Sequence, residues 1–494
     1  MAHIKKPHIK KLLAITAMSV AMGAYAQKPT PPASFQKFRE EVLGNYQNFR
    51  KEVLDNYSKF LQGVWDDYDG FRGLERDSVP KPSTPPIMPD NEDEPEIDLP
   101  TPEVEDTPVY EPDPEPQTVV PDKHDTPVAQ SSTSVIDYYG MPIEMKLTKF
   151  RISDFVADEA AYGKQWQRLH SDGLAIKQAN ILADKAKELG LNGYLTFQLV
   201  KKWVDSTYPE ADASSRISLQ HYLINMIGYE ARISLTSKRE PVLLIPFKQI
   251  IYGRPGIVIN NQRYYVFPDN DKSLKNLDGH FSTCRLPTDA DLGVVSSLVP
   301  KKLNLPWKPK KYHVEHGGIV IDGEINANYT EILRHYPLID INQYPLATID
   351  PDLRQSVVNQ IRPYIEGMSQ KDAVNKLLSF VQEGFEYATD HEFHGYEKPY
   401  FFEEMLLWDK CDCEDRAIFY SYLLWNLLGV ENHMLRYPGH ESVGVYLPDL
   451  STGIKYAADG KDFYISDPTY IGSITGHCMP KYISAKPKID YHYK

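Results

Sequence analysis

The chain is 494 residues long and carries a net charge of −14 and four cysteines. That length is enough for two or three domains, and four cysteines are too few for a disulfide scaffold, so apolar burial must hold any core together. Most of the charge lies between residues 80 and 127, where 14 Asp and Glu stand against two Lys. The remainder is nearly balanced, which argues against a nucleic-acid partner.

Residues 1–26 have the pattern of a signal peptide. A basic region at Lys5–Lys11 precedes an apolar stretch at Leu12–Met22, and small residues follow at Ala24 and Ala26. No later stretch is apolar for the ~20 residues that a transmembrane helix needs. We therefore expect a secreted or periplasmic protein, cleaved near Ala26, with no transmembrane segment.

An 11-residue repeat comes next. The units FREEVLGNYQN, FRKEVLDNYSK and FLQGVWDDYDG follow one another without a gap from Phe38. Eleven residues are close to three helical turns, so the Phe, Val and Tyr positions return to one side of a helix. The repeat predicts an amphipathic helix over residues 33–76, which either docks on its own protein, pairs with a second copy or binds a partner at the cell envelope.

A linker rich in proline and acidic residues is predicted over residues 80–133. It holds 14 of the 38 prolines together with the acidic excess. Such a stretch cannot bury enough apolar surface to offset the entropy lost on ordering, and its prolines and charge repulsion keep it extended. We expect a disordered spacer with no chemistry of its own.

From residue 135 the composition is that of a globular α+β protein. Helical periodicity is found at 176–187, 195–204, 218–226, 373–385 and 416–428. Strand patterns are found at 241–247, 263–269, 442–448 and 462–469. Strands thus follow helices twice, which predicts one domain at 135–300, a strand-rich connector at 301–350 and a second domain at 351–494.

The two domains look like copies of each other. With a shift of 201 residues, HYLINMIGYE (221–230) falls on YLLWNLLGVE (422–431), and Gly228 matches Gly429. The strand patterns follow in the same order, and Cys284 and Cys478 fall in matching places. This ordered series predicts an internal duplication.

Cys411 and Cys413 stand just before the helix predicted at 416–428. The unpaired N–H groups and the dipole at a helix N-terminus favour an anion, so they are expected to ease loss of the proton from a thiol there. His440 begins one predicted strand and Asp467 ends another. Adjacent antiparallel strands would bring this base and its orienting acid together over the start of the helix.

Three stretches in order resemble the transglutaminase-like superfamily of papain-like cysteine enzymes: CEDRA, GHESVGVYL and SDPTY. The resemblance covers about residues 369–479. It implies two tandem transglutaminase-like α+β domains and selects Cys413 over Cys411 as nucleophile, with His440 as base and Asp467 as orienting acid. It requires no cofactor and no metal, and it leaves the reaction open among crosslinking, proteolysis and deamidation.

The first copy lacks this set. The position that matches Cys413 is Asp212, or Ala213 with a moved gap, and the position that matches His440 is Arg239. Only an acid near Asp269 remains, so we expect the first copy to be inactive.

Other roles for the same residues stay open. Cys411 and Cys413 with His477 and Cys478 offer four zinc ligands, and Cys411 is otherwise a spare thiol or a bridge partner for Cys284 or Cys478. His433 is a competing base. His391 and His394 are candidates for a cleft wall, and Tyr400 and Trp408 for an oxyanion pocket.

Two functions follow from these patterns. The first is an exported cysteine enzyme that cleaves or transfers amide bonds of a protein or peptide through a Cys413 thioester, with peptidase activity favoured. The alternative is an inactive binding or scaffolding module of the envelope that uses the same fold and the N-terminal aromatic helix.

Overall fold

The computed structural model describes residues 132–147, 150, 152, 159–171, 173–236, 238–259, 261–271, 281–284 and 294–494. The predicted signal peptide (1–26), the helix over 33–76 and all but the end of the linker lie outside the described residues. The first described strand begins at Ser132, one residue before the predicted end of the linker.

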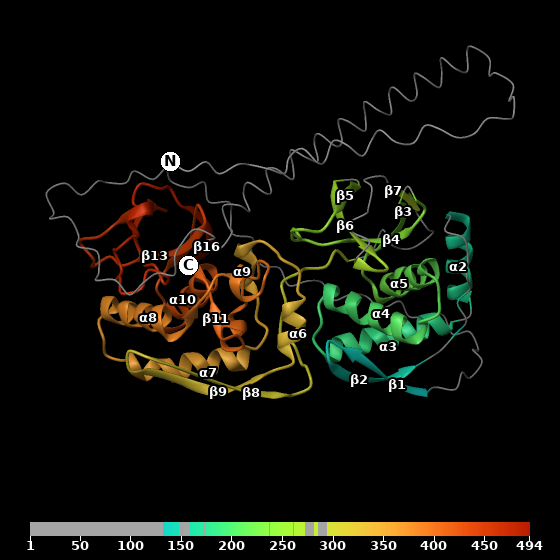
Figure 1. Ribbon diagram of the computed structural model, residues 1–494, viewed down its shortest axis with the longest axis horizontal. Coiled ribbons are helices and arrows are strands. Elements are labelled where there is room, and N and C mark those ends of the chain that lie inside the picture. Colours follow the sequence, from blue (N-terminus) through green and yellow to red (C-terminus); the bar gives the residue numbers. More distant parts are fainter. Residues whose placement is uncertain are drawn as a thin grey trace, which may run out of the picture. The chain divides into compact units, whose positions relative to one another are not determined.

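The first half combines a hairpin, four helices and a sheet (Figure 1). The hairpin and helices are β1 (Ser132–Tyr138), β2 (Met141–Leu147), α2 (Glu159–Ser171), α3 (Leu174–Glu188), α4 (Gly193–Thr207) and α5 (Ala213–Ile227). The antiparallel sheet has the order β5-β6-β4-β3-β7. Its strands are β3 (Arg232–Thr236), β4 (Pro241–Pro246), β5 (Gly256–Ile259), β6 (Gln262–Pro268) and β7 (Phe281–Cys284).

A connector follows, with a two-stranded antiparallel hairpin and two short helices. These elements are β8 (Pro309–His316), β9 (Ile319–Asn326), α6 (Tyr329–Arg334) and the 3-10 helix η3 (Ile341–Leu346).

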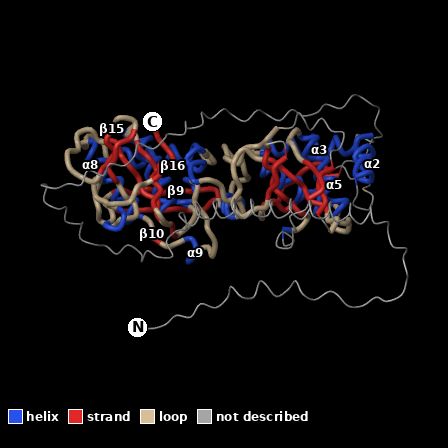
Figure 2. Tube along the Cα trace, turned by 90° about the horizontal axis from the view of Figure 1, so that it is seen from above, coloured by secondary structure: helices blue, strands red, loops and turns tan. Residues whose placement is uncertain are grey.

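The second half again places helices before a sheet (Figures 1 and 2). The elements before the sheet are α7 (Pro351–Ile361), η4 (Arg362–Tyr364), α8 (Gln370–Gly384), β10 (Glu386–Tyr387), α9 (Asp390–Phe393), η5 (Phe402–Leu406), β11 (Lys410–Cys411) and α10 (Cys413–Leu428). The sheet has the order β14-β15-β13-β12-β16. Its parts are β12 (Asn432–Tyr437), β13 (His440–Tyr446), β14 (Lys455–Ala458), β15 (Lys461–Ile465), η6 (Pro480–Tyr482) and β16 (Lys488–Tyr493).

The two sheets have the same strand order when β3 to β7 are set against β12 to β16. The helix before each sheet ends at a glycine with positive φ, Gly228 at 110° and Gly429 at 60°, the left-handed conformation that closes helices. One matched pair of the sequence comparison is wrong. Cys284 lies in β7, whose counterpart is β16, whereas Cys478 lies in the loop between β15 and η6.

All five predicted helices and all four predicted strands are confirmed within a few residues. Helix starts follow from local caps. Asp212 accepts a hydrogen bond from the Ser215 N–H at 2.7 Å before α5, and Asn192 accepts one from the Leu195 N–H at 3.1 Å before α4. Each side chain satisfies one of the amide groups that a helix start leaves unpaired.

One hydrophobic cluster reaches from Ile136 to Tyr464 and includes residues of both halves and the connector. Tyr336 links them. Its ring packs edge-on against Tyr194 at 5.5 Å and against Phe401 at 5.6 Å. The two predicted domains therefore share a core.

Within the part of the chain that the structure describes, no helix has the length and apolar character needed to cross a membrane.

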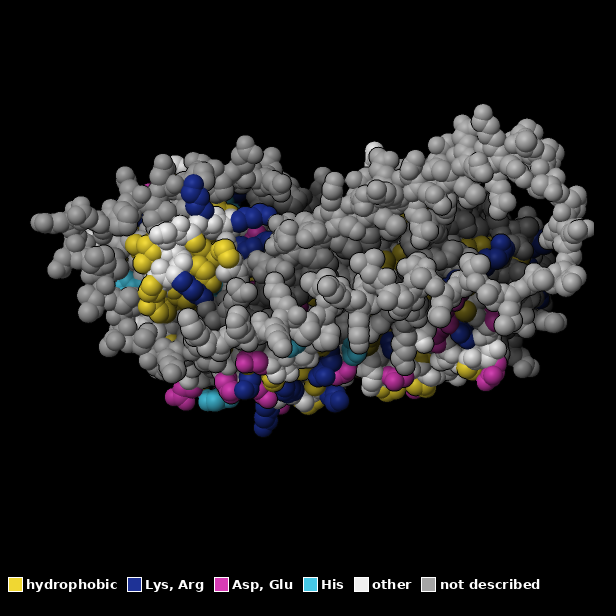
Figure 3. All heavy atoms as spheres, turned by 45° about the horizontal axis from the view of Figure 1, so that its top comes forward, with side chains coloured by type: hydrophobic (Ala, Val, Ile, Leu, Met, Phe, Trp, Pro, Cys, Tyr) yellow, Lys and Arg dark blue, Asp and Glu magenta, His cyan; other side chains and the backbone are white. Residues whose placement is uncertain are grey.

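In the view of Figure 3, hydrophobic side chains of the C-terminal half gather at the surface beside basic side chains.

Candidate active site

The start of α10 is held by Asp415, the acid of the CEDRA stretch. One oxygen of Asp415 accepts from the Asp412 N–H at 3.0 Å, and the other accepts from the Tyr400 N–H at 2.7 Å. The carboxyl group is fully buried. It therefore fixes the first turn of α10 against the loop before η5, and Cys413 is the first residue of that turn.

His440 and Asp467 come together as the sequence predicts. His440 is the first residue of β13, which pairs with β15, and Asp467 lies two residues after β15. The distance from Nε2 of His440 to Oδ2 of Asp467 is 2.8 Å, and both side chains are buried. Because Nε2 faces a carboxylate, the ring proton belongs on Nε2. Nδ1 then has a lone pair and no hydrogen-bond partner.

Neighbouring groups fix the orientation of both residues. The Oδ1 atom of Asp467 accepts from the N–H groups of Thr469 at 2.9 Å and Tyr470 at 3.2 Å. The side-chain amide of Gln382, on α8, donates to the Asp467 carbonyl at 3.0 Å and so holds the loop. The ring of Tyr482 stacks on His440 with centroids 5.1 Å apart and planes 3° apart.

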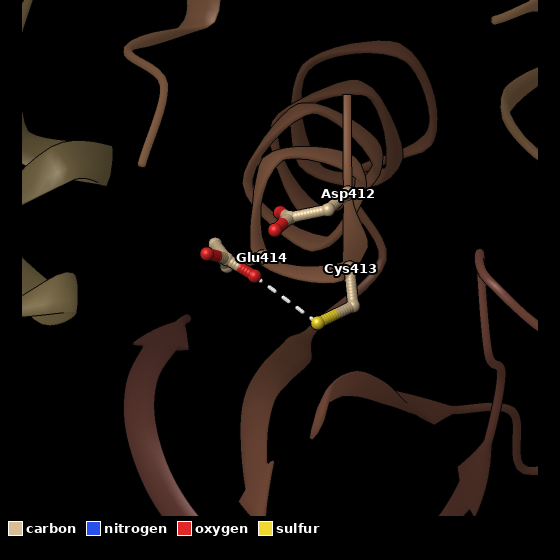
Figure 4. A group of neighbouring side chains, drawn as sticks. All are labelled: Asp412, Cys413 and Glu414. Atoms are coloured by element: carbon tan, nitrogen blue, oxygen red, sulfur yellow. Dashed lines mark hydrogen bonds between the residues drawn. The ribbon is translucent and has the colours of Figure 1, made fainter. Parts of the chain in front are cut away.

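Cys413 lies next to this pair without a hydrogen bond to His440. Its thiol is buried and donates to Oε2 of Glu414 at 3.1 Å (Figure 4). The backbone N–H of Glu441 also reaches the sulfur. Since Glu441 follows His440 directly, the sulfur is beside the start of β13.

The electrostatics differ from the prediction of an acidic thiol. Burial, followed by the charges of Glu414 and Asp412, raises the pKa of Cys413 well above its usual range, and the Glu441 N–H opposes this only in part. A thiolate would be desolvated next to two carboxyl groups, and these effects exceed the helix dipole. The expectation that the helix start lowers the pKa of Cys413 is therefore wrong.

Tyr387 is a residue of the site that the sequence analysis missed. Burial raises its pKa, and the charges of Cys413 and Asp412 raise it further. Its hydroxyl has no hydrogen-bond partner among the described residues. A two-residue parallel bridge sets Tyr387 opposite Cys411. A pairing of only two residues, between positions 24 apart in the chain, leaves no pattern in the sequence from which it could be predicted.

A cleft of about 730 Å³ opens beside Tyr387, a size typical of ligand pockets. Among its lining residues are Phe385, Tyr387, Lys410, Arg416 and Ile471. The guanidinium of Arg416 is buried and donates to the carbonyls of Gln382 at 3.0 Å and Phe385 at 2.7 Å. It thereby ties α10 to the end of α8 at the cleft wall.

The proposed zinc quartet is not brought together. Among the described residues, the side chains close enough to share a metal ion include Cys413 but neither His477 nor Cys478. Cys411, Cys413 and Cys478 are free thiols, so Cys411 and Cys478 do not form the bridge considered above. Nothing is described of the Cys284 side chain. The Cys411 sulfur accepts a hydrogen bond from Nε of Arg416 at 3.4 Å, so Cys411 helps to position the Arg416 side chain.

The competing histidine and the aromatic candidates are engaged elsewhere. His433 bonds the Tyr456 hydroxyl at 2.8 Å. His394 bonds the Tyr400 hydroxyl at 2.5 Å, and the Trp408 N–H donates to Glu404 at 3.1 Å. His391 is exposed on α9.

The described residues of the first half contain no comparable set. Ala213 starts α5, and Arg239 lies in the turn between β3 and β4 with φ of 61°. Asp269 follows β6 as Asp467 follows β15, but it pairs with Arg216, whose Nε is 2.9 Å from Oδ1.

No known protein family, no curated protein and no solved structure matches this chain.

Proposed function

We propose that the chain is a cysteine-dependent acyl-transfer enzyme of the transglutaminase-like type, acting on amide bonds of a protein or peptide, with hydrolysis as the favoured outcome. The observation that carries the proposal is the buried contact of 2.8 Å between Nε2 of His440 and Oδ2 of Asp467. Nδ1 of His440 is left without a hydrogen-bond partner among the described residues. The backbone N–H of the next residue, Glu441, reaches the Cys413 sulfur.

In the first step, Nδ1 of His440 accepts the thiol proton while the Cys413 sulfur attacks the amide carbonyl carbon. Because the pKa of the thiol is raised, proton transfer accompanies the attack and no thiolate stands ready beforehand. The carbonyl oxygen becomes an oxyanion, which the Cys413 N–H and the Tyr387 hydroxyl stabilise. Asp467 stabilises the imidazolium.

In the second step, the C–N bond breaks and His440 gives its proton to the leaving amine. The resulting thioester meets water, which yields an acid, or an amine, which yields a new amide, and His440 again moves the proton. Cleft residues beside Tyr387 would hold the peptide. The equal strand order of the two sheets supports a duplicated fold. The pairing of Asp269 with Arg216 supports a first copy that carries no chemistry.

The reaction is tested with purified protein and a library of peptides that contain glutamine and lysine, analysed by mass spectrometry. We expect cleavage products, which disappear in Cys413→Ala and His440→Ala. Deamidated or crosslinked products would assign the same thioester to another outcome. Absence of all three would count against an enzyme.

A non-catalytic binding module is the second candidate, because the Cys413 thiol is only 2% exposed and bonds Glu414 rather than His440. Alkylation by iodoacetamide separates the two. An enzyme is expected to show Cys413 labelling near neutral pH that slows in His440→Ala, whereas the module predicts slow labelling that ignores this change.

The setting of the protein is proposed from the sequence alone. Residues 1–26 would direct export, and the helix over 33–76 would bind a second copy or an envelope partner. Deletion of residues 33–72 is expected to abolish that association and to leave activity intact.

A further inference from the structure

One buried side chain at the Cys413 sulfur has no role in the proposed mechanism. Glu414, the second residue of α10, is 1% exposed, and its Oε2 atom accepts the hydrogen bond of the thiol at 3.1 Å. Figure 4 shows the sulfur and this carboxyl group turned toward each other. Nδ1 of His440, the proposed base, is buried and has no hydrogen-bond partner among the described residues. The thiol proton is thus directed to a group other than the base.

The backbone on both sides of the sulfur is held in place. Asp415 accepts two backbone N–H hydrogen bonds, at 3.0 and 2.7 Å, which fix the helix start that carries Cys413 and Glu414. The His440 ring is bonded to Asp467 at 2.8 Å and stacked on an aromatic neighbour. The remaining movement is rotation of the Cys413 side chain between staggered rotamers, which moves the sulfur and leaves the helix in place.

The groups at the sulfur favour the neutral thiol. Burial raises the pKa of Cys413, and the charges of Glu414 and then Asp412 raise it further, while the backbone N–H of Glu441 on β13 opposes the shift. A hydrogen bond from the thiol to a carboxyl oxygen stabilises the protonated form, so Glu414 competes with His440 for this hydrogen. Two other titratable groups that interact with the sulfur are neutral near pH 7, because burial raises their pKa: Tyr387 of β10 and Tyr482 of η6.

We propose that Glu414 restrains the nucleophile by holding the Cys413 thiol away from Nδ1 of His440 until the sulfur rotates toward the base. The inference rests on the proposed function, because a restraint matters only for a thiol that reacts. In the reaction the S–H group leaves Oε2 of Glu414 and turns to Nδ1, which takes the proton. Glu414 itself neither gains nor loses a proton. The restraint also explains how a complete set of nucleophile, base and acid rests without a bond between sulfur and imidazole.

Two substitutions at Glu414 test the restraint. Glu414→Leu removes the acceptor and its charge at similar volume, whereas Glu414→Gln keeps an acceptor oxygen and removes only the charge. The full chain is alkylated with iodoacetamide between pH 6 and pH 9, and mass spectrometry of fragments measures each cysteine separately. We expect Cys413 to be labelled about tenfold faster in Glu414→Leu, the effect of losing one hydrogen bond to a charged group. The midpoint of labelling should move to lower pH, with Glu414→Gln between this variant and the parent protein.

A double variant shows where the released thiol goes. Adding His440→Ala to Glu414→Leu should remove the gain in rate, because the base that the thiol then reaches is gone. A gain that survives His440→Ala would overturn the restraint, and so would Cys413 labelling that is unchanged or slower in both folded Glu414 variants. If His440→Ala alone slows labelling while the Glu414 variants do not change it, the proposed enzyme stands and the restraint is wrong.

Two controls separate release of the thiol from loosening of the fold. Cys411 and Cys478 are 4% and 5% exposed, and their labelling should stay as slow as in the parent protein. Glu188→Leu, at a carboxylate on α3 with 63% of its side chain exposed, should leave Cys413 labelling unchanged. If Glu414→Leu speeds the labelling of all three cysteines, the helix start has loosened, and Glu414→Gln, which is nearly isosteric, decides: no gain at Cys413 would then overturn the restraint.

Discussion

The Tyr387 hydroxyl is buried and has no hydrogen-bond partner among the described residues, and Tyr387 stands opposite Cys411, two residues before Cys413. We propose that it donates to an oxyanion formed at Cys413. If the proposed reaction holds, Tyr387→Phe keeps the ring and removes this donor. We expect kcat to fall by about 100-fold, the effect of losing one oxyanion donor, with KM little changed. Tyr396→Phe is the matched control, because Tyr396 is 45% exposed. A rise in KM alone, with kcat unchanged, would assign Tyr387 to substrate binding.

A second residue, His221, gives the protein a pH dependence unrelated to the site. Its pKa is lowered to about 4, from an ordinary 6.5, by burial, and its contact with the Ala231 carbonyl opposes the shift. The unfolded chain therefore binds a proton that the folded chain does not, and stability falls as pH drops from 6.5 toward 4. Urea unfolding at pH 7 and pH 5 should show a loss of about 2 kcal/mol from this residue.

His221→Gln should remove that part of the pH dependence, since glutamine can still donate to Ala231 and has no charge to gain. His335→Gln, a change at a surface imidazole with 56% of its side chain exposed, serves as control. If the unfolding free energy of His221→Gln changed with pH as steeply as that of the parent protein, the assignment to His221 would be contradicted.

At the level of single residues, the sequence predicts which side chains meet better than it predicts the burial and charge around them. His440 and Asp467 meet because one begins β13 and the other follows the end of β15, and these strands are neighbours. The raised pKa of Cys413 was not predictable, because it depends first on the burial of the thiol and then on the charges of Glu414 and Asp412, and no spacing encodes these. Tyr387 was missed because only tertiary packing sets it opposite Cys411, two residues before the nucleophile.

Among the elements, α7 and η5 are joined by a buried ion pair. Nε and Nη2 of Arg354 lie 2.6 and 2.9 Å from the oxygens of Glu403, and the side chains are 3% and 0% exposed. Arg354→Met would leave Glu403 buried without its partner, which should cost about 3–5 kcal/mol of unfolding free energy. Urea denaturation measures this loss.

Two further variants give that experiment its controls. Adding Glu403→Gln to Arg354→Met should recover part of the loss, because the unpaired charge is gone. Lys302→Met breaks the surface pair that Lys302 makes with Asp352 of α7, where the side chains are 53% and 83% exposed, and should leave the unfolding free energy nearly unchanged. Similar losses for the buried and exposed pairs would refute the argument.

The predicted elements were those with a strong period or a clear terminal signal, such as α10 with its apolar face and Gly429. Elements with weak patterns, among them the edge strands β5 and β14, were not predicted. β5 has no fully buried residue, so alternation leaves little trace in its sequence. Each of these strands is held by the strand that follows it in the chain, β5 by β6 and β14 by β15.

For the whole molecule, the shared core predicts that the two halves unfold together although the sequence reads as two domains. Tyr336 carries much of the connection. Its hydroxyl donates to the Leu298 carbonyl at 2.7 Å and accepts from the Asn192 side chain at 2.6 Å, and its ring contacts Phe401 of the second half.

Hydrogen exchange in increasing denaturant, analysed by mass spectrometry, should give the same midpoint for peptides from α4 and α10. Tyr336→Ala removes the ring and should cost about 3 kcal/mol or more, and it should separate the two midpoints because each half then opens alone. Tyr336→Phe keeps the ring contacts and should lose only about 1 kcal/mol with the midpoints still equal. Midpoints that already differ in the parent protein would mean that the two sheets and their helices are independent folding units, and that the continuous core does not couple them.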